Sequence, residues 1–424
     1  MKTAVVAGCR TPFARSGSTL KELTAIDLGK VVVRELLARA DLPGETIDRL
    51  VFGTVVHNPH APNIAREVGL GVLPHDVPAS TVSLACASAN QAIADGASLI
   101  ELGYADVVVA GGSESLSHIP ITVSDRLSAT LIEASRAKSL RDRAGAIAGI
   151  RPRDLIPVQP QIAEPTTGET MGESAERMAK ENGISREDQD AWAYRSHRLA
   201  QEGVEDGRLA DEIVPVYVPP AFEEVMDADN GIRPDTSLEA LAGLRPVFDR
   251  DHGSVTAGNA SPLTDGAAAV LLMSEKAARV HELAPLGYIR SFAVTSLDPA
   301  GQLLQGPAYA APLALERAGL TMDDIDMMEM HEAFAAQVLS NLQALDSDTF
   351  ARDELGRSSR VGHPDEDRIN VMGGSISLGH PFGATGARLT TTLLNELRRR
   401  DGEFGLLTVC AAGGMGFAMV LERA

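Results

Sequence analysis

Two similar stretches decide how this chain folds: Glu35-Leu36-Leu37-Ala38-Arg39-Ala40-Asp41-Leu42 and Leu313-Ala314-Leu315-Glu316-Arg317-Ala318-Gly319-Leu320. The same alignment pairs Ile47 with Ile325 without a gap. In both copies, the spacing of apolar residues predicts an amphipathic helix, then a short loop, then a strand (49–53 and 326–330). Similarity at a fixed offset indicates a repeated structural unit. The chain is therefore predicted to be duplicated.

A second correspondence extends the duplication. Ser83-Leu84-Ala85-Cys86 is similar to Ser377-Leu378-Gly379-His380, and each stretch is predicted to open a helix (88–102 and 383–399). Each helix leads into an apolar strand that ends in glycines. Such alternation of strands and helices predicts an α/β fold built in layers. If the halves pack pseudo-symmetrically, Cys86 and His380 occupy equivalent helix N-termini and face one shared crevice.

Between the two halves the alternating pattern breaks. The intervening stretch holds proline-rich pieces and polar helices (172–182 and 186–203). We therefore predict an inserted loop domain in an otherwise two-part chain. The predicted units are an N-terminal half of 1–116 plus 247–275, a loop domain of 117–246 and a C-terminal half of 276–424.

Bulk composition excludes several classes of protein. A chain of 424 residues is too long for one ordinary core. Its net charge of −20, from 58 acidic and 38 basic residues, argues against nucleic-acid binding. Three cysteines (Cys9, Cys86 and Cys410) form no disulfide framework and suit a reducing compartment. No apolar run reaches the roughly 18 residues of a membrane span, and no leader precedes the first strand, so we expect a cytoplasmic protein.

Cys86 is the first candidate for chemistry. It follows a short apolar strand and precedes a helix of small residues. The positive end of the helix dipole favours a thiolate there, and the N-terminal N–H groups could hold an oxyanion. The alternative is a small buried residue at a strand-to-helix junction.

His380, Cys410 and His331 are the other candidates. His380 lies among five glycines in the stretch 373–386, which indicates a backbone that turns tightly or touches a ligand. Cys410 ends a predicted strand and is followed by Ala411-Ala412-Gly413-Gly414, whose N–H groups could bind a substrate oxygen. His331 follows the strand of the second half, where a lone histidine is usually structural. Two thiols and an imidazole together suit nucleophilic catalysis on an acyl group.

Six motifs in this order make the chain resemble the thiolase family over essentially its whole length. They are the Cys86 segment, Gly112-Ser113-Glu114-Ser115-Leu116-Ser117, Val255-Thr256-Ala257-Gly258-Asn259-Ala260-Ser261, His331-Glu332-Ala333-Phe334, Gly379-His380-Pro381 and Cys410-Ala411-Ala412-Gly413-Gly414. The resemblance implies the thiolase fold, with α-β-α-β-α layers. It also implies coenzyme A as a substrate, with no permanently bound cofactor and no metal.

The resemblance implies a role for each candidate. Cys86 would take the acyl group as a thioester, and His380 would deprotonate it and later help to activate coenzyme A. Cys410 would carry the proton to or from the α-carbon. The N–H groups of Cys86 and Ala412 would form one oxyanion hole, and His380 with His331 the other.

Further positions match the family's substrate-binding residues. Ser261, with Ala257 nearby, matches positions that contact the pantetheine arm of coenzyme A. Met171 and Phe334 match positions that line the pocket. Most thiolases carry asparagine where this chain has His331, so it resembles the branch with the β-subunit of the trifunctional complex of fatty-acid oxidation. Ser83 and Ala89 also depart from the commoner asparagine and glycine.

The resemblance implies a 3-ketoacyl-CoA thiolase that releases acetyl-CoA and a shortened acyl-CoA. A biosynthetic acetoacetyl-CoA thiolase is the alternative among enzymes, and a catalytically silent protein that binds acyl-CoA or lipid is the alternative of another class. A ketoacyl synthase is disfavoured because such enzymes lack the second cysteine. Family members are generally homo-oligomers, here a homodimer or homotetramer.

One basic segment stands out in this acidic chain. It could be a solvated surface helix, a docking site for a hydratase/dehydrogenase partner, a contact with anionic lipid, or a site that attracts the phosphates of coenzyme A. Its basic residues are Arg126, Arg136, Lys138, Arg141, Arg143, Arg151 and Arg153.

Overall fold

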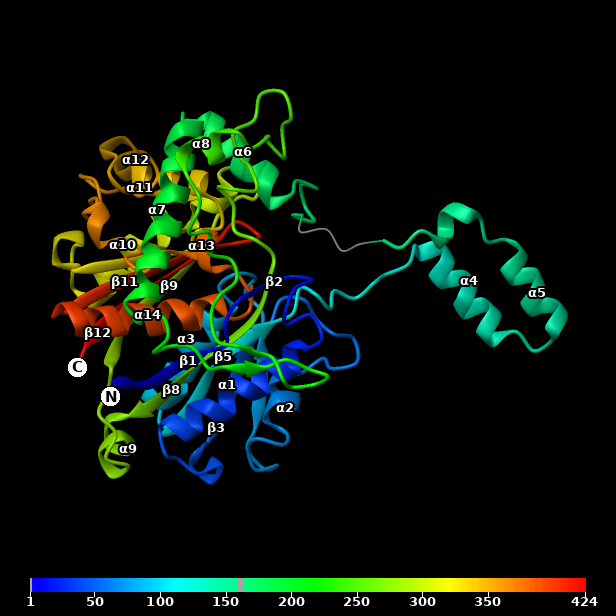
Figure 1. Cartoon of the computed structure of the whole chain (residues 1–424), viewed down its shortest axis with the longest axis horizontal. Coiled ribbons are helices and arrows are strands. Elements are labelled where there is room, and N and C mark those ends of the chain that lie inside the picture. Colours follow the sequence, from blue (N-terminus) through cyan, green and yellow to red (C-terminus); the bar gives the residue numbers. More distant parts are fainter. Residues whose placement is uncertain (1, 159–162) are drawn as a thin grey trace.

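The computed structural model describes residues 2–158 and 163–424, and it shows a layered body from which a helical hairpin projects (Figure 1). Ten strands of the described chain form one sheet. Along the sheet the path is β10 (Met327–Met330), β11 (Phe404–Ala411), β12 (Met415–Arg423), β9 (Gly287–Ser296), β1 (Thr3–Arg10), β8 (Thr264–Ser274), β5 (Val107–Glu114), β3 (Arg49–Gly53) and β4 (Ala79–Val82), with β2 (Ala14–Arg15) beside β8.

The sheet consists of two halves that meet between β1 and β9. There Thr3–Val5 pairs antiparallel with Gly287–Ile289. The strands from β1 to β4 on the path come from the N-terminal half of the chain, and those from β9 to β10 from the C-terminal half. The duplication therefore produces two half-sheets, and a short edge pairing, which the sequence did not indicate, joins them.

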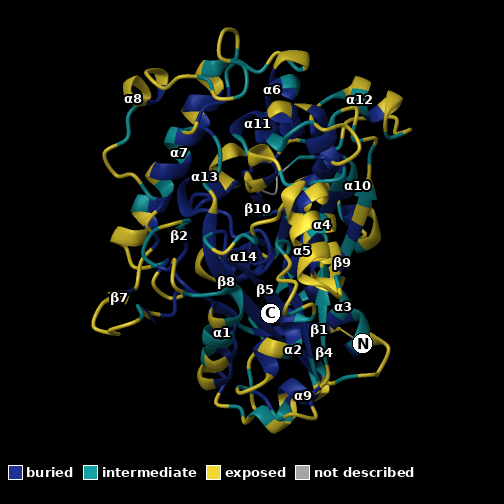
Figure 2. Ribbon diagram, turned by 90° about the vertical axis from the view of Figure 1, so that its right-hand side faces the viewer, coloured by how far each residue is buried: buried dark blue, intermediate teal, exposed yellow. Residues whose placement is uncertain are grey.

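Helices complete the predicted layers. Helices α3 (Ser88–Glu101) and α14 (Thr385–Arg400) lie between the two half-sheets and are almost entirely buried along their N-terminal turns (Figure 2). The outer faces are covered by α1 (Ala25–Arg39) and α2 (Ile64–Gly69) on one side and by α10 (Gly306–Ala318) and α11 (Ala335–Leu345) on the other. The order α-β-α-β-α is confirmed.

The two copies of the repeat have the same local structure. Each starts with a helix, α1 or α10, and each helix is followed within two residues by one in the left-handed region: Asp41 at φ 50°, after Ala40, and Gly319 at φ 73°. A positive φ ends a helix because it turns the chain out of the helical path. These two residues occupy matching positions in the repeat, and both copies continue into the predicted strands, β3 and β10.

The inserted part contains α4 (Asp125–Arg136), α5 (Leu140–Ala148), α6 (Met171–Glu181), α7 (Arg186–Glu205) and α8 (Leu238–Ala242). The predicted polar helices are α6 and α7, which pack on the C-terminal half beside α11 and α13 (Ser375–Leu378). Helices α4 and α5 form the projecting hairpin (Figure 1). The exact domain boundaries stay a prediction.

Across the described residues, none of the helices combines the length and the apolar character needed to cross a membrane.

Candidate active site

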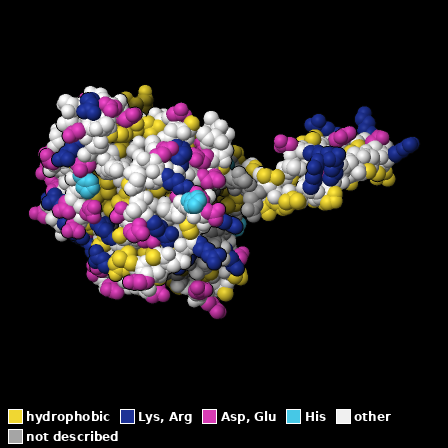
Figure 3. All heavy atoms as spheres, turned by 90° about the horizontal axis from the view of Figure 1, so that it is seen from above, with side chains coloured by type: hydrophobic (Ala, Val, Ile, Leu, Met, Phe, Trp, Pro, Cys, Tyr) yellow, Lys and Arg dark blue, Asp and Glu magenta, His cyan; other side chains and the backbone are white. Residues whose placement is uncertain are grey.

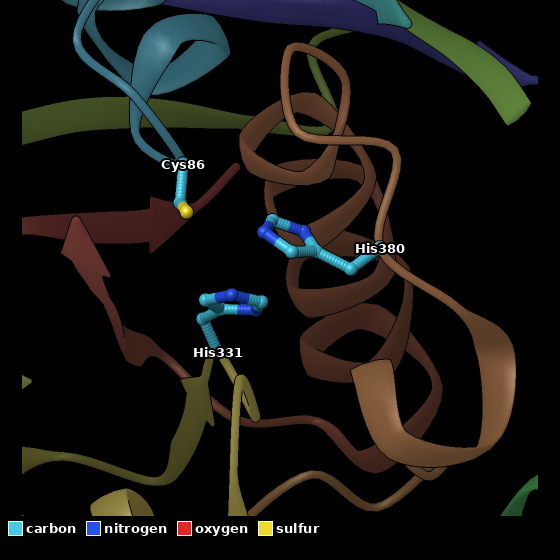
Figure 4. Close-up of side chains that lie close together, drawn as sticks. All are labelled: Cys86, His331 and His380. Atoms are coloured by element: carbon cyan, nitrogen blue, oxygen red, sulfur yellow. The ribbon is translucent and has the colours of Figure 1, made fainter. Parts of the chain in front are cut away.

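Cys86 lies in a tight turn between β4 and α3. Ala85, just before it, has a φ of 44°, a strained value for a residue with a side chain. Ser88 stabilises the turn: its Oγ accepts the N–H of Leu84 at 2.9 Å and donates to the carbonyl of Ala85 at 2.6 Å. The turn directs the Cys86 sulfur toward two histidines (Figure 4).

The two histidines come from the C-terminal half of the chain. His331 follows β10 directly, and His380 lies in the loop between α13 and α14. Their ring centroids are 4.0 Å apart, and one atom each of Cys86, His331 and His380 lies within 4.8 Å of the others (Figure 4). His380 precedes α14 by five residues, but the carbonyl of Pro381 already accepts the N–H groups of Ala384 and Thr385, so His380 lies just before the turn that leads into the helix.

Each histidine is held through Nδ1. The His380 Nδ1 lies 2.6 Å from Thr385 Oγ1, and the His331 Nδ1 lies 2.9 Å from Ser375 Oγ. Both Nε2 atoms are buried and have no hydrogen-bond partner within the described part of the chain. A buried polar atom without a partner is costly unless a ligand satisfies it. Both Nε2 atoms are thus available to a substrate.

Burial keeps this site uncharged. Although Cys86 is only half-buried by surface exposure, removal of its sulfur from water raises its pKa to about 12. The N–H groups of Ala412 and of Cys86 itself hydrogen-bond to the sulfur and offset part of that rise. The expectation that the helix dipole favours a thiolate is therefore wrong, because desolvation is the larger effect. Burial, aided by the charge of Arg388, lowers the pKa of His380 to about 3.

Cys410 lies at the end of β11, where it is buried and packs with Phe334 and Met171. Burial raises the pKa of its thiol well above the ordinary value, and the neighbouring charge of Cys86 raises it further. The two sulfurs are thus close enough to influence each other. Both are neutral thiols in the resting site.

The remaining predicted site residues surround this centre. Ala412 is half-buried beside the Cys86 sulfur. Ser261 donates its N–H to the carbonyl of Ala333 at 2.9 Å, next to Phe334. The Phe334 ring packs edge-on against Phe248, with centroids 6.3 Å apart. Ala257 is exposed in the loop before Ser261.

Sequence reasoning missed a buried carboxylate that ties the two halves together at the site. Glu114 accepts the N–H groups of Val55, Val56 and Gly383 at 2.9 to 3.0 Å, and a hydroxyl proton from Thr54 at 3.2 Å. Gly383 belongs to the loop that carries His380. The available signal was the position of this glutamate at the end of the apolar strand β5, where a charge needs partners.

The donor atoms of the centre also form a group that could hold a metal ion. Cys86, His331 and His380 offer one sulfur and two imidazole nitrogens within 4.8 Å of one another. This donor set fits Zn²⁺. Such binding would occupy the thiol and both Nε2 atoms, so it would block the site rather than assist it.

A thiol that faces two imidazoles whose Nε2 atoms have no partner among the described residues, with N–H groups against the sulfur, is the arrangement of a nucleophilic acyl-transfer site. Comparison with known proteins agrees. The thiolase N-terminal domain matches residues 3–276 and the thiolase C-terminal domain matches residues 283–423. The chain belongs to the thiolase family.

Curated relatives and solved structures point to the same family. Proteins named 3-ketoacyl-CoA thiolase from Yersinia pestis and Yersinia pseudotuberculosis are 54% identical over 422 residues, which is 99% of this chain and 97% of theirs. An acetyl-CoA acetyltransferase of Bacillus anthracis superposes with a TM-score of 0.85 at 34% identity, covering 100% of this chain and 99% of its own. Human mitochondrial 3-ketoacyl-CoA thiolase in complex with CoA superposes with a TM-score of 0.84 at 33% identity, covering 100% and 98%.

Proposed function

We propose that this protein is a 3-ketoacyl-CoA thiolase of fatty-acid β-oxidation, an acetyl-CoA C-acyltransferase. It cleaves 3-ketoacyl-CoA with coenzyme A to give acetyl-CoA and an acyl-CoA two carbons shorter. The observation that carries the proposal is the convergence of Cys86 with His331 and His380, whose Nε2 atoms have no partner among the described residues. Family membership and the curated relatives support it.

In the first half-reaction, His380 Nε2 takes the Cys86 proton as the sulfur attacks the 3-keto carbon. Since the pKa values of the free groups oppose an early transfer, the thiolate forms only as the carbon–sulfur bond forms. We propose that the N–H groups of Cys86 and Ala412 bind the resulting oxyanion, which their contact with the neighbouring sulfur supports. This intermediate collapses by breaking the bond between the 2- and 3-carbons.

The electron pair of the broken bond becomes the enolate of acetyl-CoA. His331 and the protonated His380 stabilise the thioester oxygen, and the Cys410 thiol protonates the carbon. A proton then passes from His380 to Cys410, which restores both groups. The acyl group remains on Cys86 as a thioester.

In the second half-reaction, His380 takes the proton of coenzyme A, whose thiolate attacks the acyl carbon. Cys86 leaves as a thiolate and recovers that proton from His380. Coenzyme A is thus a substrate and not a resident cofactor. We propose that Ser261 and Ala257 contact its pantetheine arm, and that Met171 and Phe334 line the acyl pocket beside Cys410.

The test is thiolysis of 3-ketoacyl-CoA substrates of increasing chain length, with acetyl-CoA measured as product. We expect cleavage of chains longer than acetoacetyl-CoA, and no turnover by Cys86→Ala. Activity confined to acetoacetyl-CoA would support the biosynthetic alternative. Binding of acyl-CoA without turnover would support the catalytically silent one.

We further propose that the α4–α5 hairpin docks a hydratase/dehydrogenase partner subunit. Leu131, Ile132, Leu140 and Ile147 are exposed on it, and hydrophobic side chains line one side while Lys and Arg gather on the opposite side (Figure 3). Exposed apolar patches are typical of interaction surfaces. Leu131→Asp should weaken co-sedimentation with the purified partner. Binding to anionic vesicles instead would indicate membrane contact.

Two further properties are proposed on family membership. The enzyme forms a homodimer or homotetramer, which light scattering of the purified protein measures. It acts in the cytoplasm, which agrees with its three free cysteines.

A further inference from the structure

Two imidazoles face Cys86, and they offer the same atom to it. In each, Nδ1 is bonded within the protein and Nε2 has no partner among the described residues. A neutral imidazole has one nitrogen that donates and one that accepts. The partner of Nδ1 therefore decides whether Nε2 is an acceptor or a donor.

For His380, the partner is a threonine whose own proton has another acceptor. Thr385 Oγ1 donates to the carbonyl oxygen of Pro381 at 3.1 Å, and a carbonyl can only accept. The 2.6 Å contact between His380 Nδ1 and Thr385 Oγ1 is then a hydrogen bond only if Nδ1 carries the proton. Nε2 of His380 is left as a bare acceptor.

For His331, the partner is a serine that already receives a proton. Arg388 Nη2 donates to Ser375 Oγ at 3.3 Å, and a guanidinium can only donate. Within the described chain, the Ser375 hydroxyl proton has one acceptor in contact, His331 Nδ1 at 2.9 Å. Nδ1 of His331 therefore accepts, and Nε2 carries the proton.

Arg388 also keeps this pair of rings neutral. It is fully buried and paired with Glu329 at 3.1 Å. Its positive charge, added to the burial of the rings, opposes protonation of both histidines. Each neutral ring then carries one proton, and the direction of its Nδ1 hydrogen bond decides which nitrogen holds that proton.

We propose that His380 and His331 hold opposite tautomers, set by Thr385 on one side and by Ser375 with Arg388 on the other. Thr385, Ser375 and Arg388 are thus positioning residues for the reaction. The effect of these tautomers on the reaction rests on the proposed function. The assignment of the two protons rests only on the hydrogen bonds of the rings.

Opposite tautomers match what the reaction needs. The bare Nε2 of His380 accepts the Cys86 proton, while the Nε2–H of His331 donates to the thioester oxygen. After that transfer, His380 also carries an Nε2–H, and two donors face the oxygen of the enolate. The enolate site is therefore complete only once Cys86 has lost its proton. Two bare nitrogens would repel the enolate, and two Nε2–H groups would leave no base.

Neutron diffraction from crystals of the full deuterated protein tests the assignment directly. We expect deuterium on Nδ1 of His380 and on Nε2 of His331. Deuterium on Nε2 of His380, or on Nδ1 of His331, overturns the proposal. This measurement does not depend on activity, so an enzyme that fails to cleave 3-ketoacyl-CoA would refute the proposed function and leave the tautomers to be judged separately.

Substitutions test the consequence. Thr385→Val removes the acceptor of Nδ1, so the rate of Cys86 acylation should fall about 100-fold, the scale of lost general-base catalysis. Thr385→Ser keeps the hydroxyl and should restore the rate to within about threefold, and the KM for coenzyme A should change little in either variant.

Thr390→Val is the matched control. Thr390 lies on the same helix, α14, and its hydroxyl donates to the carbonyl of Gly386 at 2.9 Å without contact to a histidine. The Thr390→Val variant loses the same hydroxyl from the same helix but no contact with a histidine, so its rate of Cys86 acylation should stay close to that of wild type. Equal losses in Thr385→Val and Thr390→Val would show a structural effect only and would overturn the positioning role.

Discussion

Replacing the buried Glu114 by glutamine should remove a loss of stability that the wild-type protein undergoes between pH 5 and pH 8. This carboxylate accepts three backbone N–H groups and the hydroxyl of Thr54, yet burial outweighs those bonds and raises its pKa to about 7. The folded state therefore binds the proton more tightly than the unfolded chain does, whose pKa is near 4.5. The stability that this proton provides is present below pH 4.5 and is lost as the pH rises through 7.

The magnitude follows from that difference. A change of one pKa unit corresponds to about 1.4 kcal/mol. Between pH 5 and pH 8, linkage to a shift from 4.5 to about 7 removes about 2.5 kcal/mol from the free energy of unfolding. Glutamine has the size of the protonated acid and does not titrate, so it avoids this loss. Its oxygen can still accept the N–H groups of Val55 and Gly383, whereas its NH2 group then faces the N–H of Val56, so the substitution also carries a loss of stability that does not vary with pH. Because the Gly383 contact is kept, thiolysis should stay within about threefold of wild type.

Urea denaturation of both proteins at pH 5, 6, 7 and 8 measures the effect. The free energy of unfolding of Glu114→Gln minus that of wild type should rise by about 2.5 kcal/mol across the series. Glu45→Gln, an exposed glutamate on the surface, is the control and should show no such slope. A difference for Glu114→Gln that is constant with pH, or that becomes more negative toward pH 8, would refute the reasoning.

Three more predictions concern the centre itself. Burial and Arg388 hold the pKa of His380 at about 3, so its base form persists throughout the neutral range. The acid limb of the pH profile of kcat/KM should therefore lie below pH 6.5, and a midpoint near pH 6.5 would contradict this. His331→Asn keeps an N–H donor and should retain activity within about tenfold of wild type. His331→Ala has no such donor, so exchange of the acetyl-CoA α-proton with D₂O should be about 100-fold slower than in wild type. Equal losses in the two variants would show that no donor is needed at this position. Zn²⁺ should inhibit by binding Cys86, His331 and His380, and a chelator should restore activity; Zn²⁺ binding that calorimetry finds unchanged in Cys86→Ala would place the ion elsewhere.

Much of the fold could be predicted because duplication repeats local signals. The matched positions of Asp41 and Gly319 end equivalent helices, and the strands that follow are β3 and β10. The pairing of β1 with β9 could not be predicted, since it involves only a few residues at the edges of two half-sheets. The projection of the α4–α5 hairpin also carries no local signal beyond its exposed apolar side chains.

The active site, like the fold, could be predicted from the sequence only in part. Small residues and glycines around Cys86 and His380 were the signal that singled out these two residues, which the structure brings together. The bond between Glu114 and the N–H of Gly383 joins residues 269 apart in the chain, and nothing local predicts it. The direction of the Cys86 pKa shift was wrong from sequence because the dipole of a helix can be inferred locally, whereas the depth of burial depends on the whole fold.

Peptide mapping by mass spectrometry after incubation with an acyl-CoA tests most directly whether a single thiol carries the acyl group. We expect the acyl mass on the peptide that contains Cys86, in wild type and in Cys410→Ala, and none in Cys86→Ala. Only the carbon–carbon cleavage step should be lost in Cys410→Ala. Acylation at Cys410 or Cys9 with Cys86 unmodified would contradict the account.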